Sequence, residues 1–280
     1  VTNIGGCDFT LISQEYHKNG DITNFLNSHN FLPLPQALKV LQDILFGLEY
    51  LHNNGFYHND IKPGNILIDD QNNAVLADYG IAGFSPDVLP IIPKNSYKVH
   101  RAPESTGASK VISIHSDIYQ VGCTAFRLLN GISNLKNEFI SLGEVEYEKR
   151  KAIGKIPDIS SYEDFVPSRL KTIINKALNV DPSLRFSSAL EMRRKLEKLN
   201  FAGYWTVDST SNLIGIGKKY TYSFILETNS ANSFNLIASK KNNESGNITK
   251  VKDFVRKNLT KTAVVKLRKE YFNWVIENAS

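Results

Sequence analysis

The stretch that decides the fold is Tyr57–Leu67, which reads YHNDIKPGNIL. It brings Asp60, Lys62 and Asn65 together in one short segment, and a second acid, Asp78, follows in the tetrapeptide ADYG. Phosphoryl transfer uses such a set, because one carboxylate can accept a hydroxyl proton, an acid and an amide can hold Mg²⁺, and a lysine can neutralise the moving phosphate. A polar surface turn explains any one of these residues, but not the ordered set between apolar, strand-like flanks. The sequence therefore predicts a site for phosphoryl transfer.

Together with later landmarks, this stretch resembles the catalytic loop of eukaryotic-type Ser/Thr protein kinases. Asp78-Tyr79-Gly80 is similar to the family's DFG element, with Tyr in place of Phe. Arg101–Glu104 (RAPE) matches the APE element, and Ser116–Gly122 resembles the start of the long buried helix of the kinase C-lobe. Asp181–Arg185 resembles a late element whose arginine pairs with the APE glutamate. The resemblance covers about residues 8–200 and implies a mainly helical C-lobe there.

The resemblance implies a role for each polar residue of the loop. Asp60 would be the catalytic base, and Lys62 would steady the transferring γ-phosphoryl group. Asn65 and Asp78 would hold Mg²⁺, a hard cation that prefers oxygen donors. ATP and Mg²⁺ are the implied cofactors, and the segment KPGN is more similar to Ser/Thr than to Tyr kinases. Protein substrates with Ser or Thr acceptors are therefore implied.

The same resemblance implies a nucleotide site upstream of the loop. Residues Thr10–Tyr16 are typical of a short apolar strand that enters a hinge, and Asn19-Gly20-Asp21 then opens a helix. Five nucleotide-binding residues are implied: Glu15, Tyr16 and His17 beside adenine, Asp21 at the ribose, and Leu67 as the floor of the adenine pocket.

Some residues support the loop, and others depart from the family pattern. Asp117 is expected to brace the loop backbone, and Arg185 and Glu104 to form a buried ion pair. Asn59 replaces the arginine that usually precedes the catalytic aspartate, so ordering of the activation segment by phosphate through that arginine is not expected. His100 stands where the family usually has tyrosine before the APE element.

The elements that the family places before the hinge are not found in this sequence. A whole member carries a Gly-rich phosphate loop, a strand lysine and a helix glutamate there. We expect that the chain lacks its own N-lobe, and two explanations remain open. The chain, which starts with Val1, is a fragment of a longer kinase. Alternatively the protein naturally lacks this lobe, either as a minimal kinase or because a separate subunit supplies it.

The charge is divided unevenly along the chain. Residues 1–200 carry 21 Lys and Arg against 22 Asp and Glu, whereas residues 201–280 carry 12 against 6. This shift predicts a boundary near residue 200, between a kinase-like C-lobe at 1–200 and a small basic α+β module at 201–280. The fold class expected for the whole chain is α+β.

Periodicity predicts the elements of both parts. In the first part, helices are expected at residues 35–53, 115–129, 169–178 and 187–199, with Ser187 as a possible N-cap, and short strands at 66–68 and 74–77. In the module, strands are expected at 204–207, 213–216, 220–227 and 234–238, followed by helices at 248–258 and 261–277.

A second class of function remains open, namely a non-catalytic kinase-like scaffold. The lysines of residues 201–280 could bind nucleic acid or another acidic partner, but a solvated lysine face over an aromatic core is the favoured interpretation. No apolar run approaches the roughly 20 residues of a membrane span. The two cysteines, Cys7 and Cys123, form no disulfide framework, so a reduced, cytoplasmic setting is expected.

Overall fold

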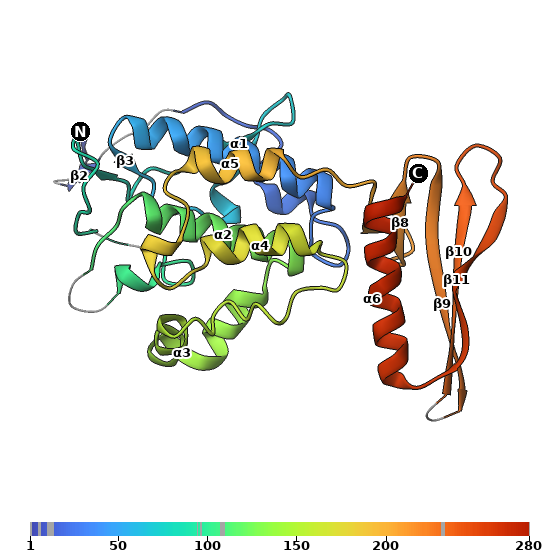
Figure 1. Ribbon diagram of the computed structural model, residues 1–280. Coiled ribbons are helices and arrows are strands. Elements are labelled where there is room, and N and C mark those ends of the chain that lie inside the picture. Colours follow the sequence, from blue (N-terminus) through green and yellow to red (C-terminus); the bar gives the residue numbers. More distant parts are fainter. Residues whose placement is uncertain are drawn as a thin grey trace.

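The computed structural model describes residues 2–4, 7–9, 14–93, 95, 97–106, 110–230 and 233–279. A helical lobe fills the first part of the chain, and an antiparallel sheet with one long helix follows it (Figure 1). The predicted α+β class is therefore confirmed. The strand that was predicted from Thr10 into the hinge falls mainly on residues 10–13, which lie outside the described residues.

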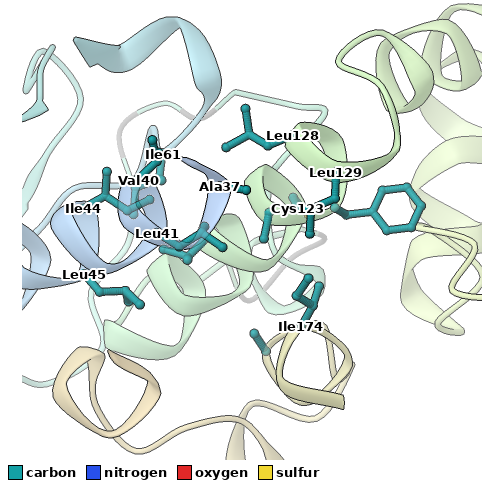
Figure 2. Close-up of a cluster of buried hydrophobic side chains, with 14 of the residues drawn as sticks. Ala37, Val40, Leu41, Ile44, Leu45, Ile61, Cys123, Leu128, Leu129 and Ile174 are labelled. Carbon is teal, nitrogen blue, oxygen red and sulfur yellow. The ribbon is translucent and has the colours of Figure 1, made fainter. Parts of the chain in front are cut away.

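The core of the lobe lies between two long helices, α1 (Leu34–Asn53) and α2 (Ile114–Asn130). Figure 2 shows side chains of both helices meeting those of Ile61 and Ile174. The leucine stripe that predicted α1 is confirmed, because Leu41, Leu45 and Leu48 are fully buried. Since Ile61 follows Asp60 directly and is itself fully buried, the core anchors the catalytic loop.

Helix α2 is buried on every side, including at its polar residues. Its N-terminus is closed by a capping box, in which Ser113 accepts a hydrogen bond from the backbone and Ser116 accepts one from the Ser113 N–H. Four polar side chains, Asp117, Gln120, Thr124 and Arg127, are buried along the helix. Their spacing of three and four residues places them on one face, which is turned to the catalytic loop.

Three further helices complete the lobe: α3 (Asn134–Ala152), α4 (Ser168–Ala177) and α5 (Ala189–Glu197). The predictions of α4 and α5 are confirmed, but Ser188, not Ser187, caps α5, because the Ser188 side chain accepts from the Glu191 N–H. Helix α3 was not predicted. It is interrupted at Gly143, whose φ of 72° is non-helical, and a broken helix gives a weak periodic signal.

Short strands frame the loops of the lobe. β1 (Thr2–Ile4) and β2 (Cys7–Phe9) form a hairpin, and β3 (Phe56–Tyr57) pairs with β6 (Gly83–Phe84). The predicted hairpin is confirmed as β4 (Ile66–Ile68) and β5 (Ala74–Leu76).

The C-terminal module is a five-stranded antiparallel sheet of order β11-β10-β9-β8-β7. The strands are β7 (Gly203–Val207), β8 (Leu213–Gly217), β9 (Tyr220–Ser230), β10 (Ser233–Asn242) and β11 (Ile248–Leu259). Helix α6 (Lys261–Asn278) packs along one face of this sheet (Figure 1). The aromatic rings of Trp205, Tyr271 and Phe272 form the centre of its core.

The helix that was predicted at residues 248–258 is wrong, because this segment is strand β11. Its two buried residues, Val251 and Phe254, are three positions apart, which is a helical spacing. The irregular pairing with β10 explains this spacing. Ser239 pairs with Lys250 and Ile237 with Val255, so β11 carries extra residues opposite one step of β10. Such a bulge changes which side chains face the core.

The module packs against the lobe through aromatic and charged contacts. Phe165 lies between Phe31 of the lobe and Phe272 of α6, at ring distances of 4.9 and 6.4 Å. Arg169 donates two hydrogen bonds to the Glu277 carboxylate, at 3.0 and 2.7 Å. Phe165 and Phe201 thus pack against both hydrophobic cores.

Replacing Gly215 by alanine is expected to destabilise the module by about 1–3 kcal/mol, because the added methyl group overpacks a filled core. A Cβ at this position would lie 2.9 Å from Val275 and 3.2 Å from the Trp205 ring. Urea unfolding followed by tryptophan fluorescence measures the change. Gly246→Ala is not a suitable control because of its positive φ, whereas Gly64→Ala has open space and no positive φ. An equal loss in both variants would contradict this packing argument.

Candidate active site

The catalytic loop is held by the polar face of α2. Asp117 accepts hydrogen bonds from the backbone N–H groups of His58 and Asn59, at 2.9 and 2.8 Å. Gln120 accepts from the Ile61 N–H at 2.8 Å and donates to the Asn59 carbonyl at 3.1 Å. The bracing by Asp117 was predicted, and the structure adds Gln120. The backbone on both sides of Asp60 is therefore fixed by buried side chains.

Asp60, Lys62 and Asn65 form one hydrogen-bonded cluster. The Asp60 Oδ2 atom accepts from Lys62 Nζ at 2.7 Å and from Asn65 Nδ2 at 2.8 Å. Asn65 Nδ2 also donates to the Asp60 carbonyl at 2.9 Å. Within the described residues, the buried Asp60 Oδ1 atom has no hydrogen-bond partner. One carboxylate oxygen is thus positioned by its neighbours, and the other is without a partner in the described part of the chain.

Asp78 lies next to this cluster but makes no hydrogen bond to it in the described part of the chain. The preceding residue, Ala77, donates its N–H to the Asn65 carbonyl at 2.9 Å, which places the end of β5 against the loop. Asp78 itself is exposed, has a left-handed φ of 65°, and accepts from the Gly80 N–H at 3.3 Å. Backbone strain at a non-glycine residue of this kind is concentrated at functional sites.

Only some of the predicted nucleotide-binding residues lie close to one another. Asp21 and Leu67 form an isolated β-bridge, and Ile68 donates its N–H to the Gly20 carbonyl at 3.0 Å. Asp21 also caps the 3₁₀ turn Ile22–Phe25, accepting from the Thr23 N–H at 2.8 Å. By contrast Glu15 and Tyr16 are exposed, with Tyr16 at 86%. His17 is half-buried and accepts a turn hydrogen bond from Gly20.

The donor set fits a hard cation in part. Asn65 uses Nδ2 for its hydrogen bonds, so its side-chain oxygen and the exposed Asp78 carboxylate are the available oxygen donors. In the described ranges, no group of three or more His, Cys, Asp or Glu residues is close enough to hold a metal ion. Mg²⁺ is commonly held by one or two protein oxygens together with substrate phosphates and water. The residues present fit this kind of coordination, and they do not form a site in which the protein alone supplies all the ligands.

A pocket of about 310 Å³ opens beside the catalytic loop. Its lining is mostly apolar and consists of Leu51, Phe56, Tyr57, His58, Tyr79 and Ala82. The Phe56 and Phe84 rings lie 4.8 Å apart at its side and are 40% and 56% exposed. Burial raises the pKa of Tyr79, whose hydroxyl donates to the Leu76 carbonyl.

The surroundings of two histidines near Asp60 lower their pKa values. Burial lowers the pKa of His58, although Asp117 and Asp60 partly oppose this. Burial also lowers the pKa of His100 well below 6.5, and the nearby Arg127 lowers it further.

Among the buried polar side chains of α2 that hold the loop, only Asp117 was predicted from the sequence. Gln120 and Arg127 were missed. Their spacing of three and four residues within an otherwise apolar helix was the available signal.

The two buried histidines predict a loss of stability in mild acid. Because their pKa values are lower in the folded state, the unfolded chain binds more protons as the pH falls below 6.5, and folding becomes less favourable. Melting temperatures between pH 7.5 and 5.5 should therefore fall toward the acid end. His100→Asn should flatten this dependence, whereas His29→Gln, at an exposed position, should not. Identical slopes in all three proteins would contradict the assignment.

Comparison with known proteins agrees with this geometry. The family model described as protein kinase domain matches residues 7–196. The chain belongs to the protein kinase family. Mitogen-activated protein kinase kinase kinase 3 of Arabidopsis thaliana is 33% identical over 187 residues, which is 65% of this chain and 27% of the relative. Serine/threonine-protein kinase PrkC of Bacillus subtilis is 28% identical over 192 residues, covering 68% and 29%.

Other kinase relatives give the same picture. Serine/threonine-protein kinase PknB of Mycobacterium tuberculosis is 26% identical over 193 residues, which is 68% of this chain and 30% of the relative. The chain thus spans less than a third of the length of these protein kinases. The predicted kinase family is confirmed. Across the described residues, no helix is both long and apolar enough to cross a bilayer.

Proposed function

We propose that this kinase-family chain transfers the γ-phosphoryl group of ATP to Ser or Thr hydroxyls of protein substrates. The observation that carries the proposal is the cluster at Asp60. One oxygen of its carboxylate is held by Lys62 and Asn65, and the other is buried without a partner in the described part. A base in this state is oriented and ready to accept a proton from an incoming hydroxyl.

The other residues divide the remaining tasks. Lys62, with its side chain 27% exposed, can reach a phosphate while it stays paired with Asp60. Asn65 and Asp78 would hold Mg²⁺, which would neutralise charge on the phosphates. Asp21 and Leu67, joined by their bridge, would contact the ribose and the adenine. Glu15, Tyr16 and His17 would contribute backbone contacts to adenine.

The Gly-rich loop, the strand lysine and the helix glutamate of a kinase would come from a further segment in this proposal, either of the same polypeptide or of a separate subunit. The apolar pocket lined by His58 and Tyr79, with the exposed rings of Phe56 and Phe84 beside it, is suited to receive such a segment. Nucleic-acid binding through residues 201–280 and a cytoplasmic location stay predictions from composition.

The test is transfer of label from radiolabelled ATP in the presence of Mg²⁺, to the chain itself or to a generic Ser/Thr substrate. Transfer that is lost in both Asp60→Ala and Asp78→Ala, and on chelation of Mg²⁺, would support the proposal. Transfer that persists in Asp60→Ala would contradict the assigned base. No transfer in any sample would overturn catalysis by this chain alone and favour the kinase-like scaffold.

A further inference from the structure

A buried arginine on α2 reaches the catalytic loop through a histidine of the segment before Arg101–Glu104. Arg127 Nη1 donates to His100 Nε2 at 2.9 Å, and His100 Nδ1 lies 2.8 Å from the carbonyl oxygen of Ile61. His100 is fully buried and Arg127 is 7% exposed. Ile61 follows Asp60 directly, so this chain of hydrogen bonds ends one residue from the proposed base.

The two contacts determine where the His100 proton lies. A guanidinium can only donate, so Nε2 must be the unprotonated nitrogen. A carbonyl oxygen can only accept, so Nδ1 must carry the hydrogen. Arg127, Lys151 and Lys62 all oppose a second proton on the ring, and burial lowers the pKa of His100 in the same direction. The imidazole is therefore held as one neutral tautomer that donates to Ile61.

Burying the charged side chain of Arg127 costs free energy of folding. Its Nε atom donates to the Ile132 carbonyl at 2.6 Å, and the nearby Tyr97 side chain partly opposes the burial that lowers the pKa of Arg127. Within the described residues, no carboxylate lies within 4.0 Å of it. A buried charge without an opposite charge lowers stability. Arg127 nevertheless stays buried among neutral partners. This placement is explained if its role is to hold His100 and the Ile132 carbonyl in position.

Tyr97 provides a second connection from Arg127 to the base. The Tyr97 side chain lies near Arg127, and its ring lies 4.8 Å from the ammonium group of Lys62. Lys62 in turn donates to the Asp60 carboxylate. Arg127 is thus connected to both the backbone and the side-chain environment of Asp60, each time through a residue of the segment at positions 97–101.

We propose that His100 and Arg127 are positioning residues, which hold Asp60 in place through the carbonyl of Ile61 and make its position depend on the seating of segment 97–101. The inference rests on the proposed phosphoryl transfer. Asn59 supports it from the other side, because its Nδ2 donates to the Asn95 carbonyl at 2.7 Å and to the Ile81 carbonyl at 3.3 Å. Neutral hydrogen bonds thus hold the loop through His100 of the segment and through Asn59, whose partner Asn95 lies just before the segment.

Two substitutions at His100 distinguish its hydrogen bond to the Ile61 carbonyl from its hydrogen bond with Arg127. In His100→Asn, the amide nitrogen can take the place of Nδ1, so the bond to Ile61 is kept. In His100→Gln, the terminal amide reaches the place of Nε2, so the contact to Arg127 is kept and the bond to Ile61 is lost. We expect His100→Gln to lower kcat by about 10- to 100-fold, and His100→Asn by only about threefold, because small misplacements of a catalytic group are costly.

The KM for ATP should be unchanged in both variants, since neither touches the nucleotide residues. Amide hydrogen exchange in the full chain gives a second readout that does not need activity. The amides of Asn59, Asp60 and Ile61 should exchange faster in His100→Gln than in His100→Asn. His29→Gln, at an exposed position, serves as the control and should match the parent protein in both measurements.

Equal kcat per folded molecule and equal loop exchange in the two His100 variants would overturn the proposal and leave His100 as a core residue only. If the parent chain transfers no phosphate, the proposed function fails separately. The exchange comparison then still decides whether His100 fixes the loop.

Discussion

Replacing Asp60 by asparagine is expected to slow phosphoryl transfer by about 10²–10⁴-fold, the usual contribution of a positioned general base. The substitution keeps the shape of the side chain, and the amide oxygen can still accept from Lys62 and Asn65. The amide has no oxygen that takes up a proton, which is the task assigned to the unpartnered Asp60 Oδ1. Single-turnover transfer with saturating ATP and Mg²⁺ measures the loss.

The matched control is Asp70→Asn, a loss of the same charge at an exposed residue whose one described ion pair is with Lys18. It should leave the rate unchanged. Binding of ATP in the presence of Mg²⁺ should be the same within about twofold in both variants, because Asp60 is not assigned to the metal or the nucleotide. If Asp60→Asn weakened ATP binding as strongly as it slowed transfer, Asp60 would instead be a ligand of the metal or phosphates.

The candidate site could be predicted where its residues are neighbours in the sequence. Asp60, Lys62 and Asn65 lie on one short loop, so their order alone brings their side chains together. The parts that hold the loop could not be predicted in this way. Gln120, Arg127 and His100 act over long sequence distances. The spacing of the polar residues in α2 marks one face of the helix, but their partners follow from how α2 is packed.

The fold could be predicted where burial follows one regular period. Helix α1 repeats its leucines along one face, and the hairpin of β4 and β5 surrounds a polar turn. Prediction failed where the backbone is irregular. The bulge in β11 gives Val251 and Phe254 a helical spacing, and Gly143 interrupts the pattern of α3. In both places the local geometry, rather than the composition, determines which side chains are buried.

Removal of the Arg185 side chain is expected to have the largest effect on stability. Its guanidinium donates to both oxygens of Glu104, at 2.7 and 2.8 Å, and to the carbonyls of His115, Asn179 and Val180. The side chain is fully buried, while that of Glu104 is 16% exposed. Arg185→Met leaves that carboxylate and these carbonyls without their donor. Breaking a buried ion pair from one side costs about 3–5 kcal/mol.

Urea unfolding with an unchanged m-value measures this loss. Lys176→Met is the control, because its ion pair with Glu191 is 41% and 34% exposed and should contribute at most about 1 kcal/mol. Glu104→Leu combined with Arg185→Met should be less destabilised than Arg185→Met alone, since the stranded charge is then removed. If the double variant were instead the less stable one, the carbonyl contacts of Arg185, rather than its pairing with Glu104, would determine how the segment before α2 is anchored.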